Sequence, residues 1–100
     1  MPGRIFFRNE EVTVSSTEVV IGQTTFRIGD ILSVRGARVR VRLLPVTRYA
    51  LLISTAADGE MERLRHREAY FIFQLVNAIQ AAMAEFASRN VQKCSAAPAA

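Results

Sequence analysis

The spacing of the apolar residues changes once along this chain, near His66, and this change constrains the fold more than any other feature of the sequence. Before it, short segments rich in Val, Ile, Thr, Phe and Tyr alternate apolar and polar side chains with the period of two that is typical of strands. After it, apolar residues recur at spacings of three and four, the period of an amphipathic helix. Because no helix lies between the strands to carry a parallel crossover, we expect an antiparallel sheet.

Turn residues divide the strand region. Gly22-Gln23 and Asp58-Gly59 are typical of two-residue hairpin turns, the latter because both central positions of a type I′ turn need a positive φ. Gly36 indicates a bulge or a turn before a strand over 38–43. Pro45 has no amide hydrogen to donate, so we expect it to end that strand or to lie on an edge.

Residues from about 66 to 90 are predicted to form one long helix. Glu68 in its first turn and Arg89 in its last turn suit the helix dipole, and Asn90 is a candidate for the left-handed residue that closes it. We therefore expect a domain over residues 1–90 and a flexible C-terminal tail over 91–100. The wide apolar stripe of the helix consists of Phe71, Ile72, Leu75, Val76, Ala78, Ile79, Ala82, Met83 and Phe86.

Together these elements predict an α+β fold that is mainly β. We expect a strongly bent antiparallel sheet, or a partly open barrel, of six to seven strands capped by one long C-terminal helix. The apolar stripe of the helix needs a partner, and the inward faces of the strands provide it. In its order of elements the chain resembles a pleckstrin-homology-like domain.

The hydrophobic segments also resemble a bacterial family of unknown function with this fold, over roughly residues 5 to 86. Members of that family often carry a pair of membrane-spanning helices between two parts of the domain, whereas Arg42 to Arg48 fills that place here. The resemblance therefore implies a variant without this hairpin, and it brings no established catalytic residues. It is carried by Phe6-Phe7, Val12 to Ser15, Val19 to Gly22, Thr25 to Ile28, Ile31, Val34, Tyr49 to Leu51, Gly59-Glu60 and Leu75 to Ile79.

Positive charge is concentrated in one segment. The chain has 13 basic and 9 acidic side chains, for a net charge of +4, and the stretch from residue 35 to 48 contains arginines but no acid. On a strand, Arg38 and Arg40 would share one face while Val39 points to the core. The candidate anion-binding residues are Arg35, Arg38, Arg40, Arg42 and Arg48.

Two interpretations of these arginines stay open. They form a surface for lipid headgroups, nucleic acid or an acidic protein segment, since the guanidinium fork suits phosphate and carboxylate. Alternatively, they protect an exposed strand edge against unwanted pairing. Under the second interpretation, acids on neighbouring strands neutralise them, the candidates being Glu10, Glu11, Glu18 and Glu62.

The sequence contains no recognisable motif for catalysis, cofactor binding or metal binding. His66 is the only histidine and lies between Arg65 and Arg67, whose charges oppose metal binding, so we interpret it as an ordinary residue of a strand-to-helix junction. Cys94 is the only cysteine, which excludes a disulfide within the chain. We predict no catalytic residue, no cofactor and no metal site. An enzyme stays an alternative if residues distant in sequence converge in a pocket.

The main functional prediction is a non-catalytic protein-binding or scaffolding module that recognises a protein partner, including a second copy of itself as a homodimer. Tyr70, Phe73 and Asn77 lie away from the centre of the apolar stripe, so they either extend packing at its rim or mark a protein-interaction surface. The alternative is an anionic membrane surface or polyanion bound by the arginine-rich strand. Nucleic acid is disfavoured, because aromatic residues are not interleaved with these arginines and no basic helix is present.

No segment has the apolar core of a signal peptide or the length of a membrane span. We therefore expect a cytoplasmic location, at the inner face of the membrane under the alternative interpretation.

Overall fold

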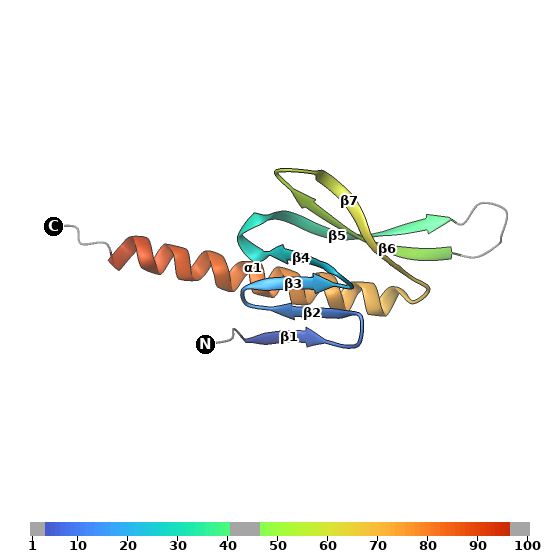
Figure 1. Cartoon of the computed structure of the whole chain (residues 1–100), viewed down its shortest axis with the longest axis horizontal. Coiled ribbons are helices and arrows are strands. Elements are labelled where there is room, and N and C mark those ends of the chain that lie inside the picture. Colours follow the sequence, from blue (N-terminus) through green and yellow to red (C-terminus); the bar gives the residue numbers. More distant parts are fainter. Residues whose placement is uncertain (1–3, 41–46, 97–100) are drawn as a thin grey trace.

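The computed structural model describes residues 4–40 and 47–96, and these form a mainly β, α+β fold with two antiparallel sheets and one C-terminal helix (Figure 1). The four-stranded sheet contains, in spatial order, β1 (Ile5–Arg8), β2 (Val12–Ser15), β3 (Glu18–Ile21) and β4 (Thr24–Arg27). A short 3-10 turn, η1 (Ile28–Asp30), leads into the three-stranded sheet. That sheet contains β5 (Ile31–Arg40), β6 (Thr47–Thr55) and β7 (Gly59–His66), and it is followed by α1 (Ala69–Ala96).

The prediction of one bent sheet or barrel is not confirmed, because the described strands form two separate sheets. The chain changes sheets at η1, where the side chain of Ile28 is buried. The antiparallel arrangement and the position of the helix after all the strands agree with the prediction.

The break predicted at Gly36 is wrong, since β5 runs through this residue and Gly36 pairs with Leu51 in regular register. The glycine serves packing instead. A Cβ atom at this position would lie 3.0 Å from Cγ2 of Ile72 on α1, so the missing side chain lets the helix approach the strand closely. The predicted end of the strand at Pro45 lies outside the described residues.

Both predicted hairpins form, but one differs in its turn. Ile21 pairs with Thr24 around Gly22-Gln23, and Gly22 has a φ of 60°. In the second hairpin Thr55 pairs with Gly59, so residues 56–58 form the loop and Asp58-Gly59 is not the centre of a two-residue turn. The backbone N–H of Asp58 donates to Oγ1 of Thr55 at 3.2 Å.

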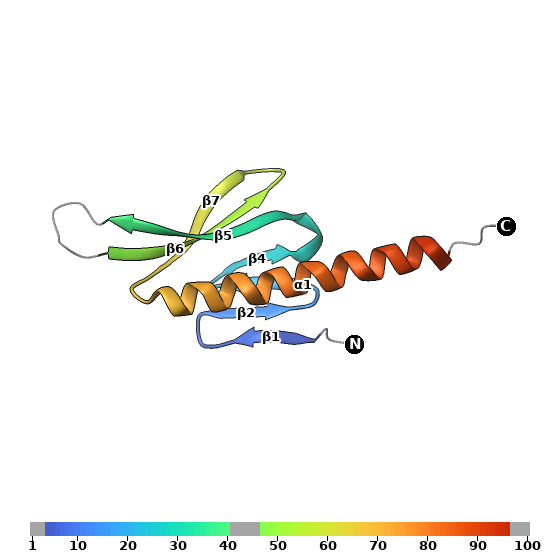
Figure 2. The ribbon, with the colours of Figure 1, turned by 180° about the vertical axis from the view of Figure 1, so that it is seen from behind.

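The apolar stripe predicted for the helix is confirmed. The helix α1 passes along both sheets and packs against β1, β2, η1, β5, β6 and β7, as the view from behind shows (Figure 2). It therefore closes a single core from one side. The fully buried side chains of this core include Val12, Val14, Val19, Leu51, Ile53, Ile72, Leu75 and Ile79.

The predicted ends of the helix are wrong. Glu68 precedes the first turn, and the helix continues through Asn90 to Ala96, so Asn90 does not close it and part of the expected tail over 91–100 is helical. Asparagine in a helix interior costs only about 0.7 kcal/mol relative to alanine, and the neighbouring Ala, Gln and Lys residues favour a helix. Within the described ranges, no helix combines the length and the apolar character that crossing a bilayer requires.

Candidate functional site

The candidate anion-binding arginines that the structure describes lie on two faces of the three-stranded sheet. Arg38 pairs with Tyr49, and it shares the face of β5 on which α1 packs against Gly36. Arg48 pairs with Val39, which puts it on the opposite face together with Arg35. Arg40 shares the face of Arg38, and Arg42 lies outside the described residues.

The orientation predicted for Arg38 and Arg40 is therefore wrong, because they lie on the inner face and half-buried Val39 on the outer face. The physical reason is the position of the helix. Strands β5 and β6 continue beyond the first turn of α1 (Figures 1 and 2), so the inner face of β5 has no helix over it there and both arginines are exposed. Strand β5 also lies at an edge of its sheet, a place where charged side chains oppose unwanted pairing.

Arg35 is neutralised by an acid that is not among the four predicted partners of the arginines. Its Nε and Nη2 each donate to a carboxylate oxygen of Glu60 on β7, both at 2.8 Å. These hydrogen bonds lower the pKa of Glu60 and raise the pKa of Arg35. Glu62, one of the predicted partners, binds Arg65 on its own strand instead, at 2.6 and 3.0 Å, and the pKa of Glu62 is lowered by this contact.

These two ion pairs predict a pH dependence of stability. The pKa values of Glu60 and Glu62 in the folded chain lie below that of free glutamate. Their ion pairs therefore stabilise the fold at pH values above the usual pKa range of glutamate, and this stabilisation is lost as the pH falls through the pKa values of the folded chain. We expect the melting temperature of wild type to exceed that of Glu60→Gln/Glu62→Gln at about pH 7 and to match it at about pH 2. The difference is small and decreases with added salt, because both pairs are exposed. An equal difference in melting temperature at both pH values would contradict this pH dependence.

Four basic side chains come together where β7 passes into α1. They line an open hollow of about 440 Å³ and consist of Arg48, Arg65, His66 and Arg67. The register brings them together. Because Tyr49 pairs with His66 in antiparallel strands, Arg67, which follows His66, lies beside Arg48, which precedes Tyr49. This basic hollow was missed by the sequence analysis. The run Arg65-His66-Arg67 was its one visible signal.

His66 is held in place at this junction. Its Nδ1 accepts the backbone N–H of Glu68 at 3.0 Å, and its ring lies against that of Phe71 with centroids 4.4 Å apart. Among the described residues no group of His, Cys, Asp and Glu side chains is assembled to hold a metal ion. His66 therefore shapes the junction and also lines the basic hollow.

The exposed face of α1 carries no charge over its first turns. Residues 69–84 include no Asp, Glu, Lys or Arg. A surface helix normally presents charged side chains to water on the face opposite its core stripe. Here Tyr70 is 71% and Phe73 is 54% exposed, and Asn77 lies on the same side of the helix. We call this the uncharged face, and its exposed residues are Tyr70, Phe73, Gln74, Asn77, Gln80, Ala81 and Ala84.

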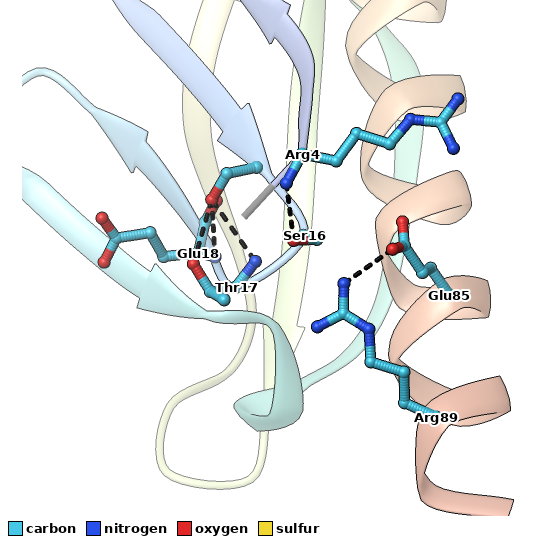
Figure 3. Close-up of polar contacts among 7 residues, drawn as sticks. Arg4, Ser16, Thr17, Glu18, Glu85 and Arg89 are labelled. Carbon is cyan, nitrogen blue, oxygen red and sulfur yellow. Dashed lines mark hydrogen bonds and ion pairs between the residues drawn. The ribbon is translucent and has the colours of Figure 1, made fainter. Parts of the chain in front are cut away.

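A second hollow, of about 540 Å³, lies between the β2–β3 turn and α1. Several polar groups of this region form local hydrogen bonds (Figure 3). Oγ of Ser15 accepts the backbone N–H groups of Thr17 and Glu18 at 3.3 and 3.1 Å, which shapes the turn itself, and Arg89 donates to Glu85 of the same helix at 2.6 Å. Oγ of Ser16 accepts the N–H of Arg4 at 3.0 Å and so ties the turn to the residue that precedes β1.

A third hollow, of about 640 Å³, lies between β4, η1 and the β6–β7 loop. The guanidinium of Arg63 covers the ring of Phe26 at 4.8 Å and donates to Asp58 at 3.3 Å. Its buried Nε has no hydrogen-bond partner among the described residues.

Compared with known proteins, the chain matches no family model, no curated protein and no solved structure. The resemblance to a bacterial pleckstrin-homology-like family stays a prediction.

Proposed function

We propose that this chain is a non-catalytic protein-binding or scaffolding module of pleckstrin-homology-like architecture, and that it meets its partner through the uncharged face of α1. The observation that carries the proposal is the exposure of Tyr70 and Phe73 on a helix that has no charged residue between positions 69 and 84. The centres of protein interfaces are depleted of charge and enriched in aromatic residues. Antiparallel strands followed by one C-terminal helix support the architecture.

A second copy of the chain is the occupant that this face suits best. Each copy has a net charge of +4, which opposes association, but two copies that meet at this face place no like charges opposite each other there. The exposed parts of Tyr70 and Phe73 offer about 250 Å² per copy, about a third of what a standard interface buries on each side. The small side chains of Ala81 and Ala84 allow two helices to approach closely, so that the other residues of the uncharged face add to the buried area.

Sedimentation velocity and light scattering at micromolar concentrations test this proposal. We expect wild type to dimerise and Tyr70→Ser/Phe73→Ser to weaken the dimer by about tenfold or more, because it removes the aromatic contact area. The matched control is Ile5→Ser/Leu32→Ser, which removes two apolar side chains that are 51% and 62% exposed elsewhere on the surface. The control should dimerise as wild type does.

A wild type that stays monomeric up to about 100 μM would overturn self-association. Binding of other proteins would then be tested by comparing wild type with Tyr70→Ser/Phe73→Ser in capture from the native cell. If both capture the same proteins in the same amounts, the uncharged face is not the binding surface.

An anionic membrane or a polyanion is the second candidate partner, bound through β5. It is favoured by the exposure of Arg38 and Arg40, neither of which forms an ion pair with another described residue. The variant Arg38→Gln/Arg40→Gln tests this candidate, since it should lose binding to acidic vesicles if β5 carries it.

A further inference from the structure

We propose that the basic hollow lined by Arg48, Arg65, His66 and Arg67 is a binding site for a phosphate group of the monoester type, as present in inorganic phosphate and in phosphorylated headgroups. The site is separate from the uncharged face, and the proposal does not depend on the protein-binding function. It is carried by the composition of the hollow, because the four residues that line it in the described part of the chain are all basic.

The fold assembles this site from segments that are distant in sequence. Arg48 lies in the first part of β6, whereas Arg65 and His66 end β7 and Arg67 follows in the connection to α1. Antiparallel pairing of Ala50 with Arg65 and of Tyr49 with His66 holds the two chain segments together. The backbone positions of Arg48, Arg65 and His66 are therefore set by strand pairing before any ligand binds, and only the side chains of the arginines need to be ordered on binding.

The charges of the hollow are only partly balanced. Glu62 occupies the guanidinium of Arg65 through two hydrogen bonds. Arg48 and Arg67 form no ion pair with any described residue, so two of the three arginines keep their hydrogen-bond donors for a ligand. Like charges held together repel, and an anion that binds between them removes this repulsion.

His66 shapes the hollow and does not supply its donors. It pairs with Tyr49, so its side chain lies on the inner face of the sheet, opposite Arg48 and Arg65. There its Nδ1 accepts the N–H of Glu68 and its ring lies against that of Phe71. The arginines of the hollow therefore supply the donors for a phosphate oxygen.

The shape and lining of the hollow select the ligand class. A planar guanidinium donates two parallel N–H groups, which match two oxygens of a phosphate. The hollow is open, and in the described part of the chain its lining residues are three arginines and one histidine. It therefore suits an exposed terminal phosphate.

The test measures binding of two phosphate sources to the whole chain. Inorganic phosphate is titrated into ¹⁵N-labelled protein at constant ionic strength, with chloride as the reference anion, and amide shifts are followed. In parallel, co-sedimentation is measured with phosphatidylcholine vesicles that contain either phosphatidic acid, a phosphomonoester, or phosphatidylserine at equal surface charge. Binding to phosphatidic acid alone identifies a lipid source, and binding of inorganic phosphate without vesicle binding identifies a soluble source.

We expect phosphate to shift the amides of residues 48 and 65–67, and Arg48→Gln/Arg67→Gln to weaken binding by about tenfold or more. Arg48→Lys/Arg67→Lys keeps the charges but loses the planar forks, so it should show an intermediate loss. The matched control, Arg4→Gln/Arg27→Gln, removes the same charge at two exposed positions outside the basic hollow and should bind within about twofold of wild type. Circular dichroism confirms that each variant is folded. Should Arg48→Gln/Arg67→Gln unfold, the single variant Arg67→Gln at an exposed position replaces it.

Two results would overturn the proposal. The first is a wild type whose amides do not respond to about 20 mM phosphate and that shows no preference for phosphatidic acid. The second is an equal loss of binding in Arg4→Gln/Arg27→Gln and Arg48→Gln/Arg67→Gln, which would assign binding to general electrostatic attraction.

Discussion

Replacing Ile79 by alanine should lower the free energy of unfolding by about 2–5 kcal/mol. The side chain of Ile79 is 0% exposed and lies in the middle of the stripe through which α1 packs on both sheets. Its truncation removes apolar surface from the core and leaves a cavity that rigid neighbours on two sheets fill only in part. Urea unfolding followed by far-UV circular dichroism measures the change.

The same experiment tests whether α1 joins the two sheets into one cooperative unit. Amide hydrogen exchange in Ile79→Ala should accelerate in β2 and in β6 together, because both sheets pack on this helix. The matched control is Gln80→Ala, the adjacent exposed residue of the same helix, which should change stability by less than about 0.5 kcal/mol. Acceleration confined to one sheet, or a loss below about 1 kcal/mol in Ile79→Ala, would contradict this account.

Replacing Gly36 by valine should destabilise the fold by about 1–3 kcal/mol. A Cβ atom at Gly36 lies 3.0 Å from Cγ2 of Ile72, a side chain that is 1% exposed and packed in the core, so it cannot move aside without disturbing its neighbours. The two additional methyl groups of valine enlarge the overlap and push α1 away from β5. Thermal unfolding measures the loss.

The control for this substitution is Ala37→Val, one residue along β5 and on the opposite face. Valine suits a strand, so this variant should be neutral within about 0.5 kcal/mol. The loss of stability in Gly36→Ala should lie between those of Gly36→Val and Ala37→Val. Alanine reduces the conformational freedom of the unfolded chain, and this gain offsets part of the cost of the close contact with Ile72. If Gly36→Val proved as stable as wild type, the close approach of α1 at this glycine would not be a constraint on the fold.

Local features of this chain could be predicted because they depend on residues that are near one another in sequence. The apolar stripe of α1 follows from the 3.6-residue period of the helix, and the hairpin at Gly22-Gln23 from the positive φ that glycine adopts. Element ends were less predictable. Asn90 is a common closing residue, yet the helix passes through it since the local preference is weak.

The candidate site was predictable only in part. Tyr70, Phe73 and Asn77 were placed correctly on the exposed side of the helix, because a helical period assigns faces along a single element. The orientation of Arg38 and Arg40 was predicted wrongly, because the alternation along one strand does not show which of its two faces meets the core. The partner of Arg35, Glu60, lies two strands away and depends on a register that the sequence does not reveal.

The sequence by itself determined which segments are strands and which is the helix, because periods of 2 and 3.6 arise from backbone geometry and the burial of apolar side chains. Only the tertiary structure decided that the strands divide into two sheets at η1, that the helix rests on Gly36, and that Arg48 meets Arg65 and Arg67 in one hollow. The physical reason is that these features depend on strand register and on where α1 begins relative to β5. Both are set by contacts between residues far apart in the chain.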